Sequence, residues 1–325
     1  MDKLSLIKAP VLNELKKFDL LFDAALTSEN PLLQEVLSYI RQKKGKMMRP
    51  ALVLLLARLL GGINQKTLHS AVSLELLHTA SLVHDDVVDE SSERRGRASV
   101  NAVFHNKVAV LSGDYVLAAS LLQASQTTSP AIISLIARLG QDLSEGELLQ
   151  LSNVADQNVS EEVYFNIIRK KTAALFATSA SVAAHSADAE PAQVEFAYLL
   201  GEYIGICFQI KDDIFDYYEA KEIGKPTGND MHEGKLTLPA IYALRKVGEN
   251  AEISSLVRKI KALQASEEEI HRMIDFCVEN GGIDYAMARM KEYRDKAVAL
   301  LERYPDSEVK RALLAFVDYV VEREL

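Results

Sequence analysis

The feature that most constrains the fold is a helical spacing of apolar residues that continues through almost the whole chain. Apolar residues recur three and four positions apart, strand-like alternation is scarce, and Ala, Leu, Glu and Lys abound. Prolines lie near the starts of these segments, where a missing backbone N–H is harmless. They are Pro31, Pro50, Pro130, Pro191 and Pro239. The pattern predicts an all-α protein.

The chain offers no clear boundary between domains. It contains no linker rich in Gly, Ser or Pro and no low-complexity segment, so residues 1–325 are predicted to form a single domain. The segments 67–91 and 192–219 are apolar on most sides, which predicts two central helices. The least helical stretch, 220–239, is predicted to be a loop.

Composition narrows the possible partners and location. The net charge of -9 and the pI near 5.4 argue against nucleic acid as a partner, although local basic clusters can still bind phosphates. The N-terminus lacks an apolar signal region, and the apolar run 51–62 is too short to span a bilayer. We therefore expect a cytoplasmic protein, and we expect Cys207 and Cys277 to be buried, reduced thiols.

A short acidic motif occurs twice. The stretch LVHDDVVDE at 82–90 resembles QIKDDIFDY at 209–217, and both have the form DDxxD on an apolar helical segment. Four residues make about one helical turn, so Asp85 projects from the same face as Asp89, and Asp212 from the same face as Asp216. A single DDxxD is more often a solvated helix end than a site.

Two copies on the two most apolar segments favour a metal site. Carboxylates beside a core need compensation, because burying an unpaired charge is costly. Oxygen-only ligands favour Mg²⁺ or Ca²⁺, and Mg²⁺ completes its coordination shell with substrate phosphates. We predict two facing DDxxD helices that hold Mg²⁺, with Asp86 and Asp213 about 100° round each helix from the first aspartate.

Basic residues accompany these motifs. Taken singly, most are ordinary surface cations, but together they predict a site for more than one polyanion, one held through metal and one held directly. His78, two turns before Asp85, belongs to the same group of candidate residues. The basic residues are Lys46 and Arg49 at a helix start, Arg94 and Arg95 after the first motif, Lys171 beside Thr172, and Lys225 and Lys235 in the loop.

The motifs together closely resemble those of the trans-isoprenyl diphosphate synthases, or polyprenyl synthetases, from about residue 25 to the C-terminus. Seven stretches carry the resemblance: GKMMRP, ELLHTASLVHDDVVDESSERRG, AVLSGDY, GELLQL, KTAALF, FQIKDDIFDY and GKPTGNDMHEGKLTLP. The resemblance implies a single bundle of antiparallel helices around a central cavity, usually homodimeric, with the two DDxxD motifs facing across the cavity mouth.

The resemblance also implies a role for each matching position. The primary Mg²⁺ ligands would be Asp85, Asp89 and Asp212, with Asp86, Asp213 and Asp216 in a second tier. Isopentenyl diphosphate would contact Lys46, Arg49, His78 and Arg95, and the allylic diphosphate Arg94, Lys171, Lys225 and Lys235. The catalytic candidates are Lys171 and, near the developing cation, Thr172 and Gln209.

Two positions depart from the family pattern. Met47 stands where the family often has an arginine, and because Lys46 and Arg49 remain we expect little loss. The loop reads GND where an acidic pair is common, which argues against a metal role for Asp230.

The growing product should run from Asp85 down the interior of its helix. Short-chain family members often carry an aromatic plug four or five residues before this aspartate, whereas here Ser81 and Ala80 are small. This predicts an open tunnel and a long-chain product of the size used for quinone side chains. Candidates for its floor are Leu77, Leu74, Leu117, Leu121 and Leu122.

The predicted function is Mg²⁺-dependent, head-to-tail condensation of isopentenyl diphosphate onto an allylic diphosphate, giving a long-chain all-trans polyprenyl diphosphate. A short-chain synthase that makes farnesyl or geranylgeranyl diphosphate is the nearest alternative. A terpene cyclase is disfavoured, because cyclases usually carry a different second metal motif. A non-catalytic helical partner subunit is the alternative from another class. Release of an oily product would bring transient membrane contact.

Overall fold

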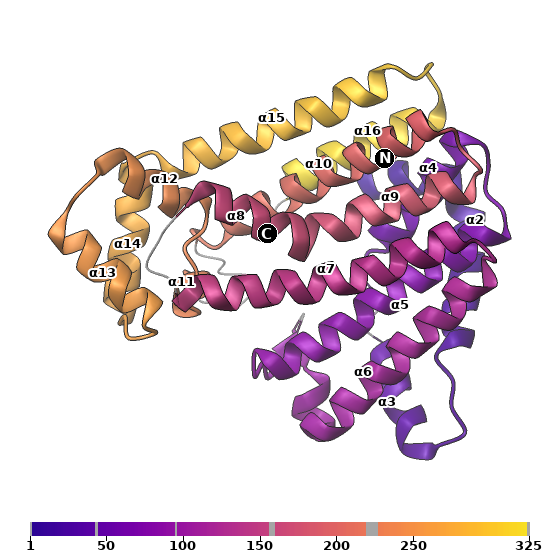
Figure 1. Ribbon diagram of the computed structural model, residues 1–325, viewed down its shortest axis with the longest axis horizontal. Helices are drawn as coiled ribbons and strands as arrows, with labels where there is room; N and C mark the ends of the chain where they lie inside the picture. The colour runs from indigo at the N-terminus through magenta and orange to yellow at the C-terminus, as the bar shows by residue number, and fades with distance from the viewer. Residues whose placement is uncertain (1, 43–44, 95, 156–159, 219–226, 324–325) are drawn as a thin grey trace. The chain divides into compact units, whose positions relative to one another are not determined.

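The computed structural model describes residues 2–42, 45–94, 96–155, 160–218 and 227–323, and these ranges are almost entirely helical (Figure 1). The predicted all-α class is confirmed. Strands within the described ranges are limited to β1 (Glu93–Arg94) and β2 (Arg97–Ala98), which pair antiparallel directly after the first acidic motif.

The helices follow the predicted spacing of apolar residues. They are α1 (Lys3–Lys8), η1 (Ala9–Val11), α2 (Leu12–Ala25), α3 (Pro31–Arg41), α4 (Met48–Leu60), α5 (Gln65–Val88), α6 (Val100–Gln126), α7 (Pro130–Ala155), α8 (Glu161–Ile168), η2 (Arg169–Ala173), α9 (Ala174–Ser186), α10 (Pro191–Phe215), α11 (Asn229–His232), α12 (Leu238–Val247), α13 (Ala251–Lys261), α14 (Glu267–Glu279), α15 (Gly282–Glu302) and α16 (Glu308–Glu322).

Local sequence signals explain where the helices begin. Pro31 is the first residue of α3, and the side chain of Asn30 accepts a hydrogen bond from the Leu33 N–H at 3.1 Å. At the start of α5, Asn64 and Thr67 each accept from the other's backbone N–H. These reciprocal bonds satisfy backbone donors that a helix start would otherwise leave unpaired.

The chain divides into two compact units. Unit 1 comprises Met1–Gln141, Leu175–Gly201 and Leu301–Phe316. Within it α5 and α6 lie side by side and antiparallel (Figure 1), joined by hydrogen bonds in which the Ser73 and Ser120 hydroxyls each donate to the other residue's carbonyl at 2.8 Å. A Cβ at Gly113 would lie 2.3 Å from the His84 ring, so the glycine of AVLSGDY leaves room for the ring in its present position. The packing fixes the helix that carries the first acidic motif.

Unit 2 comprises Asp142–Ala174, Glu202–Leu300 and Val317–Leu325. In it α12 packs against α8 and α14, and α13 packs against α14. Lys261 is buried, and its ammonium donates to the Asn153 carbonyl at 2.8 Å, which supplies the partner that a buried charge needs. That residues 1–325 form a single domain stays a prediction.

Both cysteines are buried free thiols, as predicted. Burial raises the pKa of Cys207 and of Cys277 to about 12. Only about one thiol in 10⁴ would then be ionised at pH 8, and the thiolate is the reactive form. We expect no reaction with Ellman's reagent within minutes in the folded protein, and reaction of both thiols in guanidinium. Rapid release of the chromophore by the folded protein would contradict this burial.

Helix α6 (Val100–Gln126) is long and apolar enough to cross a membrane by length and composition, and it is the one such helix among the described residues. Only 39% of its most apolar window is buried. The apolar run 51–62 noted in the sequence instead forms most of α4, whose side chains are largely buried.

Candidate active site

The first acidic motif lies at the C-terminal end of α5. Asp85 is half-buried, and Asp89 is exposed and ends the helix, its N–H donating to the Asp85 carbonyl at 2.8 Å. The helix ends at Val88, three residues before the predicted 91, because Glu90 adopts a left-handed φ of 50°. Two carboxylates at the negative end of a helix dipole form a favourable environment for a cation.

The middle aspartate of this motif has an arginine partner. Asp86 is 2% exposed, and Arg94 Nε donates to its Oδ1 at 2.5 Å. Arg94 lies in β1, shortly after the end of α5, and its charge compensates the buried carboxylate. Arg94 therefore lies beside the acidic motif, whereas Arg95 lies outside the described residues.

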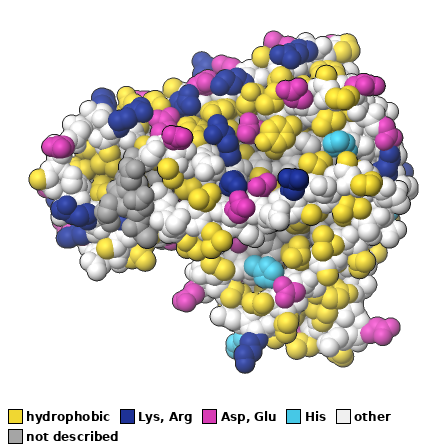
Figure 2. Space-filling model, viewed as in Figure 1, with side chains coloured by type: hydrophobic (Ala, Val, Ile, Leu, Met, Phe, Trp, Pro, Cys, Tyr) yellow, Lys and Arg dark blue, Asp and Glu magenta, His cyan; other side chains and the backbone are white. Residues whose placement is uncertain are grey.

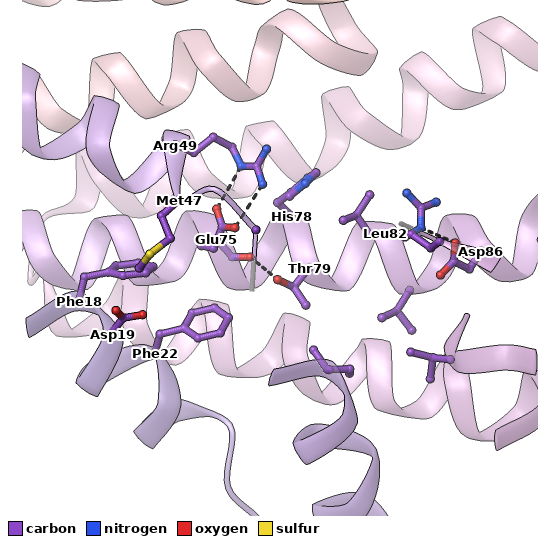
Figure 3. A pocket seen from close by; sticks show the side chains of 15 residues that line it. Phe18, Asp19, Phe22, Met47, Arg49, Glu75, His78, Thr79, Leu82 and Asp86 are labelled. Atoms are coloured by element: carbon purple, nitrogen blue, oxygen red, sulfur yellow. Dashed lines mark hydrogen bonds and ion pairs between the residues drawn. The ribbon is translucent and has the colours of Figure 1, made fainter. Parts of the chain in front are cut away.

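A pocket in unit 1 contains two of the residues predicted to bind isopentenyl diphosphate, Arg49 and His78 (Figure 3). Arg49 donates through Nε and Nη2 to the two carboxylate oxygens of Glu75, at 3.1 and 3.2 Å, and this bidentate pair fixes the plane of its guanidinium. Met47, with a left-handed φ of 54°, also lines the pocket, and Lys46 is exposed just before it.

The same pocket has an apolar part and a charged part. Phe18 and Phe22, stacked with ring centroids 5.8 Å apart, lie near Met47, and Asp86 lies further along α5 (Figure 3). Arg94 lines the pocket as well. Unit 1 thus brings Arg49, His78 and Arg94 to one concave, partly apolar surface, which suits an amphipathic anion such as a prenyl diphosphate.

The second acidic motif lies at the end of α10 in unit 2. Arg323, which follows α16, donates through Nη2 to Asp212 Oδ1 at 2.5 Å and to the Phe208 carbonyl at 3.0 Å. Its guanidinium also lies over the Phe208 ring, 3.9 Å from the centroid. Asp212 therefore has a cationic partner that the sequence did not predict.

Asp216 holds the start of α11 (Asn229–His232). Its Oδ1 and Oδ2 accept hydrogen bonds from the backbone N–H groups of Asn229 and Asp230, at 2.9 and 3.0 Å. Gly228 precedes them with a φ of 77°, and a Cβ there would lie 2.5 Å from Ile270 Cγ2. Only glycine suits this position, which explains that residue of the GKPTGND stretch.

Asp213 belongs to a buried hydrogen-bond network. Its carboxylate accepts from the Tyr164 hydroxyl at 2.5 Å and from Gln209 Nε2 at 2.8 Å, and Gln209 Oε1 accepts from the Thr172 hydroxyl at 2.6 Å. Burial raises the pKa of Asp213 well above its ordinary value, as does the nearby charge of Asp230. Two catalytic candidates, Thr172 and Gln209, are therefore in direct contact.

Lys171 and Thr172 lie on a π-helical turn, η2, within an otherwise α-helical segment. Such turns are rare and often occur at functional sites. Lys171 Nζ lies 2.6 Å from Glu147 Oε2. A Cβ at Gly146 would lie 2.7 Å from the Lys171 backbone nitrogen, so the glycine of GELLQL allows α7 to approach this turn.

Replacing Gly146 with Ala should displace the turn that carries Lys171. The backbone cannot yield as a flexible side chain can, so we expect the free energy of unfolding to fall by about 1–3 kcal/mol and turnover to fall with it. Gly140 on the same helix is a matched control, because a Cβ there meets nothing within 4 Å. Thermal unfolding and steady-state rates of G146A and G140A check this; equal values for the two variants would contradict it.

A second pocket, within unit 2, gathers Lys171, Thr172, Gln209 and Lys235 together with Asp230. Lys235 forms an ion pair with Glu233. Burial raises the pKa of Asp230 to about 7, and the charge of Asp216 acts in the same direction while Lys235 opposes it. Lys225, predicted to contact the allylic diphosphate, lies outside the described residues.

The carboxylates fit a hard cation. Among the described residues, no group of three or more His, Cys, Asp or Glu side chains is arranged to hold a metal ion by itself. Mg²⁺ commonly takes one or two carboxylates and completes its shell with water and substrate phosphates, so the pair Asp85 and Asp89 suits it. One DDxxD lies in each unit, and that the two motifs face each other stays a prediction.

The residues predicted to control product length lie along α5. Ala80 and Leu77 are 1% and 3% exposed, and the Ser81 hydroxyl donates to the His78 carbonyl at 2.9 Å. Of the candidates on α6 for the tunnel floor, Leu121 and Leu122 are 48% and 66% exposed, which disfavours them as a floor within one chain.

The fold and the acidic motifs define a class of all-helical enzymes that act on prenyl diphosphates, and comparison with known proteins gives the family. The polyprenyl synthetase family matches residues 30–276, and the chain belongs to this family. The predicted resemblance, the isoprenoid-synthase type of all-α fold and the prenyltransferase class are confirmed.

Individual relatives differ in product. The chain is 40% identical over 301 residues to octaprenyl diphosphate synthase of Haemophilus influenzae, covering 92% of this chain and 91% of the relative. Among solved structures it is similar to geranylgeranyl pyrophosphate synthase from Bacteroides thetaiotaomicron, with 55% identity, a TM-score of 0.88 and coverage of 99% and 100%. It is also similar to a Caulobacter crescentus polyprenyl synthase complexed with calcium and isoprenyl diphosphate, with 30% identity, a TM-score of 0.91 and 98% coverage of both chains.

Proposed function

We propose that the protein condenses isopentenyl diphosphate head-to-tail onto an allylic diphosphate, with Mg²⁺, and makes a long-chain all-trans polyprenyl diphosphate for quinone side chains. The observation that carries the proposal is the repeated DDxxD motif, each copy at the end of a long buried helix in a chain of the polyprenyl synthetase family. Relatives named octaprenyl and heptaprenyl diphosphate synthases support the long-chain product.

The acidic residues divide into two groups in this proposal. Asp85, Asp89 and Asp212 hold the metal, while Asp86, Asp213 and Asp216 hold Arg94, Gln209 and the start of α11 through the contacts described above. Bound Mg²⁺ would stabilise the negative charge that develops on the leaving diphosphate. The Caulobacter structure, which contains a divalent cation with a prenyl diphosphate, supports a metal of this kind.

The basic residues bind the two diphosphates. Arg49, oriented by Glu75, acts with Lys46, His78 and Arg95 on isopentenyl diphosphate. Lys171 and Lys235 act with Arg94 and Lys225 on the allylic diphosphate and stabilise it as it leaves. Arg94, Lys171 and Lys235 are each paired with a carboxylate, and these partners keep each cation near its working position.

The chain's own groups then shape the carbon–carbon bond formation. Thr172 and Gln209 lie near the developing allylic cation, and the surrounding apolar side chains keep water from quenching it. Isopentenyl diphosphate, held beside the cation, attacks through its double bond in an effectively unimolecular step. We assign the final proton to the departing diphosphate, because no motif side chain is an obvious base.

A geranylgeranyl diphosphate synthase is the second candidate, favoured by the 55% identity to the Bacteroides thetaiotaomicron structure. The test is incubation of the purified chain with labelled isopentenyl diphosphate and farnesyl diphosphate, with Mg²⁺ or EDTA, followed by chromatography of the products. The long-chain proposal predicts Mg²⁺-dependent products well beyond geranylgeranyl diphosphate. Accumulation of geranylgeranyl diphosphate would establish the second candidate. Absence of both product and released diphosphate would establish an inactive partner subunit.

We further propose a cytoplasmic, single-domain chain that forms homodimers and touches the membrane transiently during product release. Hydrophobic side chains appear among polar ones over α6 (Figure 2), and Leu111, Leu121 and Leu122 are 68%, 48% and 66% exposed. A second copy that covers this face would remove that apolar area from water. Light scattering coupled to gel filtration should give twice the mass of one chain, and a monomer would count against the dimer.

A further inference from the structure

The hydrogen-bond network around Asp213 includes a tyrosine that neither the acidic nor the basic motifs contain. Tyr164, on α8, is 6% exposed and lies two turns before Lys171 in the sequence. We propose that Tyr164 is a positioning residue that fixes the Gln209–Thr172 pair through Asp213. The inference rests on the proposed function, because that function gives Gln209 and Thr172 their place beside the reacting cation.

Both oxygens of Asp213 are committed to the protein. Oδ2 accepts from the Tyr164 hydroxyl at 2.5 Å and Oδ1 from Gln209 Nε2 at 2.8 Å, with Asp213 only 2% exposed. Removing one donor from such a buried carboxylate is costly, because water cannot replace it. Asp213 is therefore an internal anchor, unlike Asp212, its neighbour in the motif, which is more exposed and pairs with Arg323.

The hydrogen bonds from Thr172 through Gln209 to Asp213 all run in one donor-to-acceptor direction. In the structure the NH₂ side of Gln209 faces Oδ1 of Asp213, and its carbonyl side faces the Thr172 hydroxyl. The Thr172 hydroxyl must then donate to Gln209, which leaves the lone pairs of its oxygen as the electron-rich side of this pair. A proton on Oδ2 of Asp213 would leave this order unchanged, because Oδ1 still accepts from Gln209.

The network also joins two segments that carry the site. Tyr164 and Thr172 belong to the continuous segment α8–η2, whereas Gln209 and Asp213 lie one turn apart on α10. Tyr164 binds α10 at one end of this segment and Thr172 binds it at the other. Loss of the Tyr164 hydroxyl would free one oxygen of the anchor and let Asp213, and with it Gln209, change rotamer.

The test is Tyr164→Phe, which removes one oxygen atom and keeps the buried ring. We expect kcat to fall about 10- to 100-fold, the range expected when a buried acceptor is left without its hydrogen bond. The half-saturating Mg²⁺ concentration and the KM for isopentenyl diphosphate should stay within about twofold, because the proposed metal ligands and basic residues are untouched. Asp213→Asn, which can donate to Gln209 and reverse its amide, should lose at least as much kcat.

Tyr217→Phe is the matched control, because Tyr217 is a buried tyrosine of the same unit whose hydroxyl lies 3.5 Å from Thr237 and outside the network. The Y217F variant should keep kcat within about twofold of the parent while losing about as much thermal stability as Y164F loses. Equal kcat values for Y164F and Y217F would overturn the inference, as would a Y164F defect that excess Mg²⁺ restores. Failure of the proposed function is distinguishable, because the parent enzyme itself would then form no prenyl product.

Discussion

Asp85→Asn is expected to abolish prenyl transfer and leave the fold intact. The variant keeps the size of the side chain but removes half of the carboxylate pair at the end of α5, so the metal that balances the leaving diphosphate is lost. A loss of about 4 kcal/mol of transition-state stabilisation, a moderate figure for such electrostatics, corresponds to roughly a thousandfold in rate. Released diphosphate, measured at saturating Mg²⁺, gives the rate, and circular dichroism gives the fold.

Asp306→Asn is the matched control for this experiment. Asp306 is an exposed aspartate of the same unit, and it pairs with Arg311, away from the acidic motif. The rate of D306N should equal that of the parent. A D85N variant that retains rates close to those of D306N would remove Asp85 from the metal site.

Ala80→Phe is expected to shorten the product by several isoprene units. Ala80 lies on α5 about one turn before Asp85 and is 1% exposed, so an added ring must occupy space beneath the acidic motif. Overpacking at such a site costs about 1–3 kcal/mol of stability, which a large helical protein should survive. Chromatography of products made from labelled isopentenyl diphosphate measures the change.

Leu77→Ala is the companion variant for product length, because it enlarges the space one turn further from Asp85. We expect its products to be as long as those of the parent or longer. Identical product distributions for the parent, A80F and L77A would show that the tunnel does not follow this side of α5.

The sequence predicted the helices well because their signals are local. Apolar spacing, prolines near N-termini and the glycines after α4 are all read within a few residues, and α5 and α10 lie close to the predicted 67–91 and 192–219. The observed helix ends differ from the predicted ones where the φ of a single residue ends the helix, as at Glu90. The π-helical turn at 169–173 could not be predicted, because its first four residues, RKKT, are polar and carry no apolar spacing.

The acidic and basic motifs could be found from their repetition and order, but their partners could not. Glu75, Arg323 and Tyr164 reach their partners across 26, 111 and 49 residues of sequence, and only tertiary packing brings them together. Tyr164 on α8 and Arg323 just after α16 are an isolated aromatic and an isolated charged residue, and neither gives a signal of its own. Glu75 alone had a weak sequence signal, since it precedes His78 by one turn within the ELLHTASL stretch.

If both aspartate motifs bind one diphosphate through shared divalent metal, their contributions to that binding must be coupled, and a double-mutant cycle measures the coupling. Calorimetry would give the affinity for inorganic pyrophosphate, with and without Mg²⁺, of the parent, D85N, D212N and the double variant. We expect Mg²⁺-dependent binding and a coupling of at least about 1 kcal/mol, so that the double variant loses less than the two single losses combined. Binding that is independent of Mg²⁺, or losses that simply add, would show that the two motifs do not share a metal-bound diphosphate.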